Sequence, residues 1–143
     1  MTRGQNALIG VAFIVAVGVA TLLTLRDSGG PLLVYEKQGG FQGVALDLTI
    51  ERDGTAVLRD EAPEASTARF VLDDETMANL EEAIGRVDWA DVAGDHSVAG
   101  ADLIQVTFTH EGRTVRGNLS TPQEQPLFAL VAILDREIAQ ARS

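Results

Sequence analysis

The first 26 residues carry one long apolar run. The segment Ala7–Leu25 contains no charged side chain, and two threonines are its only polar residues. A helix of these 19 residues would be about 28 Å long, close to the roughly 30 Å hydrocarbon core of a bilayer. The pattern predicts a transmembrane helix over about residues 7–25, within an N-terminal anchor of residues 1–26.

A cleaved secretory signal is the alternative interpretation of this run. Arg3 supplies a basic start, and Gly18–Ala20 offers a small-x-small cleavage site. However, the apolar region of a signal is usually about 7–15 residues long, and this run continues to Leu25. We therefore favour a retained anchor. The short N-terminal tail and the large acidic C-terminal part indicate a single-pass cell-membrane protein whose C-terminal domain is extracytoplasmic.

The residues that follow show the alternation of a folded sheet. Residues 27–31, DSGGP, form a short linker, and residues 32–143 are expected to fold as one domain. Between Val44 and Ile50, apolar residues recur at every second position, which is the period of a half-buried strand. Asp53–Gly54 marks a tight hairpin turn. Strands are predicted over residues 32–37, 44–51, 55–59, 69–72, 103–109 and 114–119.

Two later stretches have apolar residues at helical spacing, and each would place one stripe against a sheet. The first begins at acidic Asp73–Glu75, which favours a helix N-terminus. Its stripe comprises Met77, Leu80, Ala83, Ile84 and Val87. For the second helix, residues 121–124 (TPQE) form a capping box at one candidate start, and Pro126 is the other candidate start because an interior proline removes a helical hydrogen bond. Its stripe comprises Leu127, Leu130, Val131, Leu134, Ile138 and Ala141.

The order of these segments predicts the fold class. Strands, a helix, strands and a second helix follow one another, and residues 90–101 are predicted to be a loop. The economical packing is an α+β fold: an antiparallel sheet of about four to six strands with two helices on one face, preceded by the transmembrane helix.

Charge and composition narrow the classes of partner. All 21 acidic residues follow Arg26, against nine Lys and Arg, so the part from Asp27 onward has a formal charge of −12. The negative electrostatic potential of this part of the chain repels nucleic acid and anionic lipid headgroups, so we expect no nucleic-acid partner. The chain has no cysteine, which excludes disulfides, thiolate metal sites and cysteine nucleophiles.

No residue pattern indicates catalysis, a metal site or a cofactor. His96 lies in a segment rich in Gly and Ala without a ligand motif, and His110 falls at a predicted hairpin tip, where polar residues are expected. Ser97 lacks a nucleophile-elbow context. We therefore predict a protein that is not an enzyme.

The segment YEKQGGFQG, residues 35–43, is the candidate binding site. It places Gly39, Gly40, Phe41 and Gly43 between two predicted strands. The interpretation that the sequence favours is a turn in which the glycines supply unusual dihedrals and Phe41 packs inward. The other is a projecting loop whose Phe41 and bare backbone contact a partner.

The same segment carries a resemblance. Val34–Gly43, followed by Leu48–Ile50 and the Asp53–Gly54 turn, resembles the emfourin-type inhibitors of protealysin. The similarity continues through LDDETMANLEEAI, the hairpin of residues 106–115 and the C-terminal helix, and it covers about residues 33–140. GGF-x-G is its most specific part.

The resemblance implies a small antiparallel sheet backed by two helices, and non-catalytic blocking of thermolysin-like zinc metallopeptidases. The only site residues that the resemblance implies in this chain are Gly39, Gly40, Phe41 and Gly43. This chain departs from the family in its membrane anchor, its loop at residues 61–67 and its acidic balance.

We therefore expect a membrane-anchored, non-catalytic domain that binds another protein, with a thermolysin-like metallopeptidase as the candidate partner. The lipid bilayer is the expected partner of Ala7–Leu25. The alternative is a structural or envelope-associated module with no inhibitory activity.

Overall fold

The structure is a computed structural model that describes residues 29–61, 64–98, 102–118 and 125–143. The chain divides into two units, Met1–Gly30 and Pro31–Ser143. The anchor expected at residues 7–25 lies outside the described residues. Within the described ranges, no helix is both long enough and apolar enough to span a membrane.

The first half of the domain is a meander of four antiparallel strands. They are β1 (Leu33–Gly39), β2 (Val44–Ile50), β3 (Thr55–Asp60) and β4 (Ser66–Val71). The predicted turn between β2 and β3 forms because Gly54 adopts a φ of +89°, which its lack of Cβ permits. The Asp53 carboxylate accepts a hydrogen bond from the Thr55 N–H at 2.9 Å and closes this turn.

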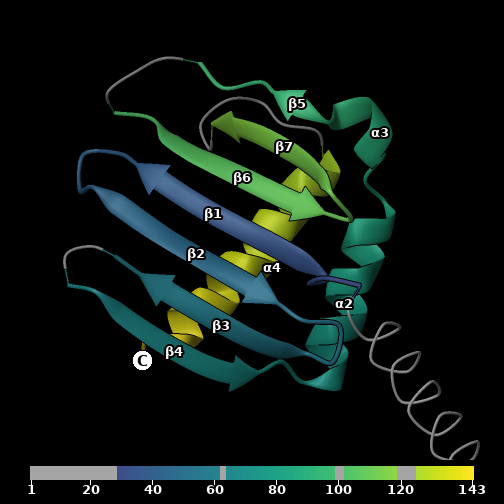
Figure 1. Ribbon diagram of the computed structural model, residues 1–143, viewed down its shortest axis with the longest axis horizontal. Helices are drawn as coiled ribbons and strands as arrows, with labels where there is room; N and C mark the ends of the chain where they lie inside the picture. Colours follow the sequence, from purple (N-terminus) through teal and green to yellow (C-terminus); the bar gives the residue numbers. More distant parts are fainter. Residues whose placement is uncertain (1–28, 62–63, 99–101, 119–124) are drawn as a thin grey trace, which may run out of the picture. The chain divides into compact units, whose positions relative to one another are not determined.

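The second half returns to the same sheet. After helix α2 (Asp74–Gly85) come the short helix α3 (Trp89–Val92) and the two-residue strand β5 (Gly94–Asp95). A hairpin of β6 (Ile104–His110) and β7 (Arg113–Asn118) follows, and helix α4 (Gln125–Ala141) ends the fold. The strand order is β4-β3-β2-β1-β6-β7-β5 (Figure 1).

The predicted fold class is wrong in two respects. The sheet has seven strands rather than four to six, and it is mixed because β5 pairs in parallel with β7. The segment expected to be a loop, residues 90–101, contains β5 and all of α3 except its first residue, Trp89. A two-residue strand has no measurable periodicity, and both of its residues are exposed, so hydrophobic patterning does not detect it.

The two long helices were predicted close to their observed positions. The Asp73 side chain caps α2 by accepting a hydrogen bond from the Thr76 N–H at 2.7 Å, and this bond lowers the pKa of Asp73. Figure 1 shows α4 crossing one face of the sheet from the β7 side towards the β3–β4 side.

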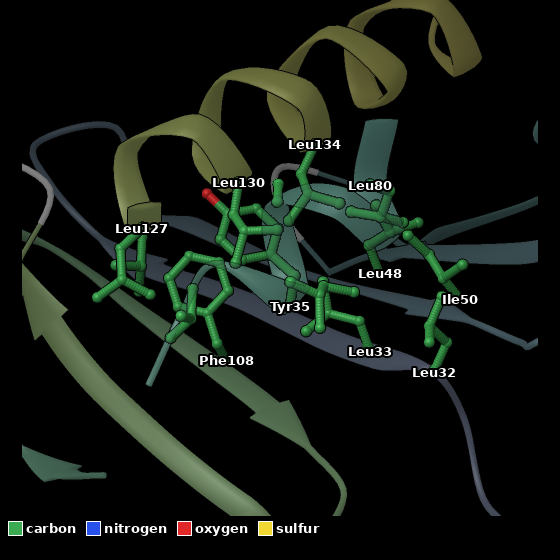
Figure 2. Packing of buried hydrophobic residues seen from close by; sticks show 14 of the residues in the cluster. Leu32, Leu33, Tyr35, Leu48, Ile50, Leu80, Phe108, Leu127, Leu130 and Leu134 are labelled. Atoms are coloured by element: carbon green, nitrogen blue, oxygen red, sulfur yellow. The ribbon is translucent and has the colours of Figure 1, made fainter. Parts of the chain in front are cut away.

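The core lies between this face and the helices. The strand register places Val115, Phe108, Tyr35, Leu48 and Leu58 side by side in one row across five strands. All five are buried, as are Leu127, Leu130 and Leu134 of α4. Figure 2 shows these three leucines on the side of α4 that faces Phe108, Tyr35 and Leu48. The opposite face carries the alternate side chains and is only partly buried.

Candidate functional site

The tip of the β1–β2 hairpin comprises Gly39, the last residue of β1, and the four-residue turn of residues 40–43. Gly39, Gly40 and Gly43 adopt φ values of +97°, +75° and +64°, a region that L side chains rarely occupy. The Gly43 N–H donates a hydrogen bond to the Gly40 carbonyl at 3.1 Å. These glycines therefore set the path of the turn, as the first interpretation of this segment supposed.

Two of the glycines also permit a close approach to β6. A Cβ on Gly39 would lie 2.8 Å from the Leu103 carbonyl oxygen, and one on Gly40 would lie 2.8 Å from the Ile104 Cγ1. A Cβ on Gly43 would meet no atom within 4 Å. Gly39 and Gly40 thus lie close against the start of β6, whereas there is open space beside Gly43.

Phe41 projects from this turn into solvent. Its side chain is 92% exposed, whereas Phe108 is almost completely buried. The expectation that Phe41 packs inward is therefore wrong. Burial of a phenylalanine side chain is favourable by about 1.5–3 kcal/mol, and folding of this domain does not gain that free energy from Phe41.

Exposed polar residues flank the tip. Gln38 and Gln42 are exposed on either side of Phe41. The Glu61 N–H donates to the Ala45 carbonyl at 2.8 Å, which brings an exposed carboxylate close to the base of the hairpin. An aromatic ring on a well-defined turn is a shape that can fill an apolar pocket of another molecule.

The residues considered for chemistry have local structural partners. His96 Nε2 lies 2.9 Å from the Val92 carbonyl oxygen, and the Ser97 hydroxyl donates to the Asp95 carboxylate. His110 is not a solvated tip residue, because its Nδ1 lies 2.7 Å from the Leu32 carbonyl oxygen and its ring lies 5.1 Å from that of Trp89. Among the residues that the structure describes, no three His, Asp or Glu side chains form a group that could hold a metal ion.

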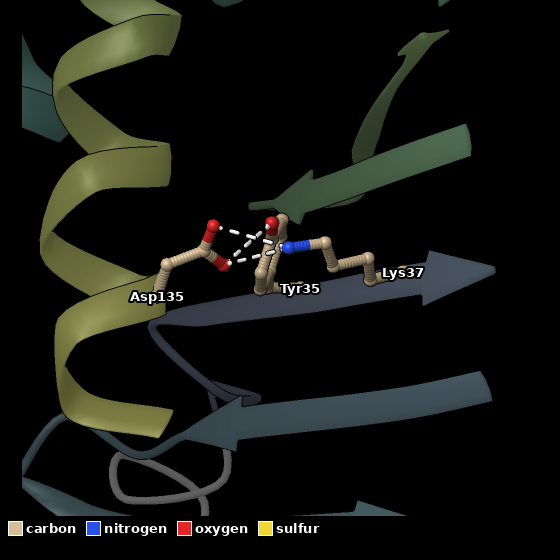
Figure 3. A network of polar contacts seen from close by, with 3 residues as sticks. All are labelled: Tyr35, Lys37 and Asp135. Carbon is tan, nitrogen blue, oxygen red and sulfur yellow. Dashed lines mark hydrogen bonds and ion pairs between the residues drawn. The ribbon is translucent and has the colours of Figure 1, made fainter. Parts of the chain in front are cut away.

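A polar network that hydrophobic patterning did not indicate joins β1 to α4 (Figure 3). The Tyr35 hydroxyl donates to Asp135 Oδ1 at 3.2 Å, and Lys37 Nζ lies 3.2 and 3.1 Å from the two Asp135 oxygens. Tyr35 and Lys37 share the helix-facing side of β1, since they are two positions apart. Burial, and then the charge of Asp135, raises the pKa of Tyr35 well above its usual range.

We expect the folded domain to suppress ionisation of Tyr35. The pKa of Tyr35 is higher in the folded domain than in the unfolded chain, where it is about 10. The neutral phenol therefore contributes its full stability below about pH 10, and this contribution is lost as the pH rises above about 10. Tyr35 is the only tyrosine in the chain, so tyrosinate absorbance reports its titration directly. In an alkaline titration, tyrosinate should form only together with unfolding; its formation while the circular dichroism stays native would contradict this.

Comparison with known proteins adds no family assignment. No protein-family model matches the chain, and no curated protein sequence matches it either. The resemblance to emfourin-type inhibitors therefore remains an expectation from the residues quoted above.

Proposed function

We propose that the domain is a non-catalytic protein-binding module and that its contact element is the tip of the β1–β2 hairpin, residues Gly39–Gly43. The exposure of Phe41 carries the proposal. The Phe41 ring is not part of the core, and it projects from a turn whose backbone path is determined by Gly39, Gly40 and Gly43.

The structure of the turn supports tight binding at low entropic cost. Ordering a flexible loop on binding opposes association, whereas a turn already held by Gly39 and Gly40 against β6 loses less freedom. Aromatic residues that enter a fully desolvated pocket often dominate the energy of an interface. Phe41 is therefore the residue that we assign to the partner's pocket.

A thermolysin-like zinc metallopeptidase is the partner class that we propose to test first. The proposal rests on the resemblance of GGF-x-G to the emfourin-type inhibitors. Since the resemblance transfers only to Gly39, Gly40, Phe41 and Gly43, we confine the proposed contact to the tip.

The test is inhibition without turnover. The full-length chain, purified in mild detergent, is titrated into thermolysin, and cleavage of a small fluorogenic peptide is measured. We expect inhibition by the intact chain, with no cleavage of the chain itself. We expect Phe41→Ala to weaken inhibition by about 30-fold or more, the effect typical of a binding hot spot.

Phe128→Ala is the matched control, because Phe128 is a second exposed phenylalanine, at 42%, on helix α4. It should inhibit as the wild type does. Equal weakening by both substitutions would contradict the role of the tip. Unchanged cleavage at high molar excess of the wild-type chain would favour a structural or envelope-associated module instead.

Membrane anchoring is a separate proposal, supported by the sequence of residues 7–25 alone. An uncharged segment of this length partitions into a bilayer and resists extraction at high pH. After an alkaline carbonate wash of membranes, we expect the intact chain in the pellet. Release of the whole chain, including residues 1–26, into the supernatant would contradict the anchor.

A further inference from the structure

Strand β4 forms one edge of the sheet and is long enough to pair with another strand. It has six residues, Ser66–Val71, and in the part of the chain that the structure describes it pairs only with β3. Figure 1 shows it at the edge of the sheet, beside β3. The opposite edge, β5, has two residues. A free edge of this length exposes backbone donors and acceptors that an extended peptide can satisfy.

The register shows which backbone groups point outward. The Leu72 N–H donates to the Gly54 carbonyl at 2.9 Å, so Leu72 faces β3. In an antiparallel pair, successive residues face their partner and then face away. The N–H and C=O groups that point to the free side therefore belong to Thr67, Arg69 and Val71.

The side chains of the same three residues share one surface. They alternate with Ala68 and Phe70, which are partly buried against the core, so they lie on the open face of the sheet. Val71 is 71% exposed, and Arg69 is exposed and takes part in none of the salt bridges between described residues. The edge thus presents, in order, a hydroxyl, a positive charge and an apolar side chain.

A second copy of this chain is a poor occupant for this edge. A symmetric antiparallel pair of β4 strands would place Arg69 opposite Thr67, Val71 or the other Arg69, and never opposite a carboxylate. Like charges directly opposite each other are destabilising. The strongly negative charge of residues 27–143 adds repulsion between copies.

We infer that β4 binds an extended segment of another protein by antiparallel strand addition, and that this segment carries a carboxylate opposite Arg69. Antiparallel addition continues the meander of β1 to β4. Read from its N-terminus, the segment has an apolar residue opposite Val71, an acidic residue opposite Arg69 and a hydroxyl residue opposite Thr67. The recognised pattern is apolar-x-acidic-x-Ser/Thr.

The test uses two fluorescein-labelled peptides, Ser-Val-Ser-Glu-Ser-Thr-Gly and the same peptide with Lys in place of Glu. Their binding to the full-length chain in detergent is measured by fluorescence anisotropy. We expect the Glu peptide to bind at least about fivefold more tightly than the Lys peptide. Arg69→Glu should reverse this preference, and hydrogen exchange of the bound chain should slow at Thr67, Arg69 and Val71.

A proline tests the strand pairing itself. Thr67→Pro removes an N–H that points outward and leaves the hydrogen bonds to β3 in place, so it should abolish binding of the Glu peptide. Thr67→Val, which keeps the N–H, is its control and should bind. Phe41→Ala should also bind, which separates this site from the hairpin tip.

The inference is overturned if the Glu peptide does not bind, if Arg69→Glu leaves the preference unchanged, or if exchange slows elsewhere but not in β4. It is also overturned if the chain forms a dimer that Thr67→Pro dissociates, because the occupant would then be a second copy.

Discussion

Replacing Phe108 by alanine is expected to destabilise the domain by about 3–5 kcal/mol. Phe108 is buried at the centre of the sheet, where its ring stacks on that of Tyr35 with the centroids 5.1 Å apart (Figure 2). The alanine would leave a cavity between β6, β1 and α4. The free energy of unfolding of small domains is about 5–15 kcal/mol, so this loss is a large part of the total stability.

The measurement is unfolding by urea, followed through the fluorescence of Trp89, the only tryptophan in the chain. Phe41→Ala is the control, and it should change the free energy of unfolding by less than about 0.5 kcal/mol because its side chain is exposed. A small effect for Phe108 together with a large one for Phe41 would mean that the tip, and not this ring, belongs to the core.

Replacing Asp135 by leucine is expected to cost about 2–3 kcal/mol. Lys37, whose side chain is only 15% exposed, would lose its carboxylate, and the Tyr35 hydroxyl would lose its acceptor (Figure 3). An ammonium group left without a partner in a mostly buried position is unfavourable. The double variant Lys37→Met with Asp135→Leu should recover most of the lost stability.

A surface ion pair provides the comparison for this second prediction. Glu82 and Arg86 are paired on α2, and both side chains are more than half exposed. Glu82→Ala should therefore cost less than about 0.5 kcal/mol in the same urea unfolding measurement. If Asp135→Leu cost no more than Glu82→Ala, the network between β1 and α4 would not contribute to stability.

Local patterning predicted those parts of the fold in which burial alternates regularly. The stripe of α4 and the alternation in β2 appear as expected, with Leu130, Leu134, Leu46 and Leu48 buried. The start of α2 follows from the capping ability of Asp73. In these segments, each residue's exposure depends mainly on its position within one amphipathic element.

The missed features depend on contacts between distant segments. The pairing of β5 with β7 involves backbone groups, and exposed Gly94 and Asp95 carry no burial signal for it. Strand β4 begins at Ser66, before the predicted residue 69, because an edge strand requires little apolar sequence. Asp135 joins Tyr35 across 100 positions, which no local period encodes.

The candidate site also has one part that the local sequence predicts and one part that depends on contacts with distant segments. The requirement for glycine at residues 39, 40 and 43 follows from the turn itself. Whether Phe41 packs inward or projects depends on the space left by β6 and the core, and sequence reasoning favoured the inward position. The alternation of the flanking strands does not extend into the turn, so it gives no direction for this side chain.

The most direct test of the binding tip is hydrogen exchange of the full-length chain with and without saturating thermolysin. If the hairpin tip is the contact element, exchange should slow at the amides of residues 38–44 and stay unchanged around Phe128. Unchanged exchange at residues 38–44 in the presence of the saturating peptidase would contradict the account.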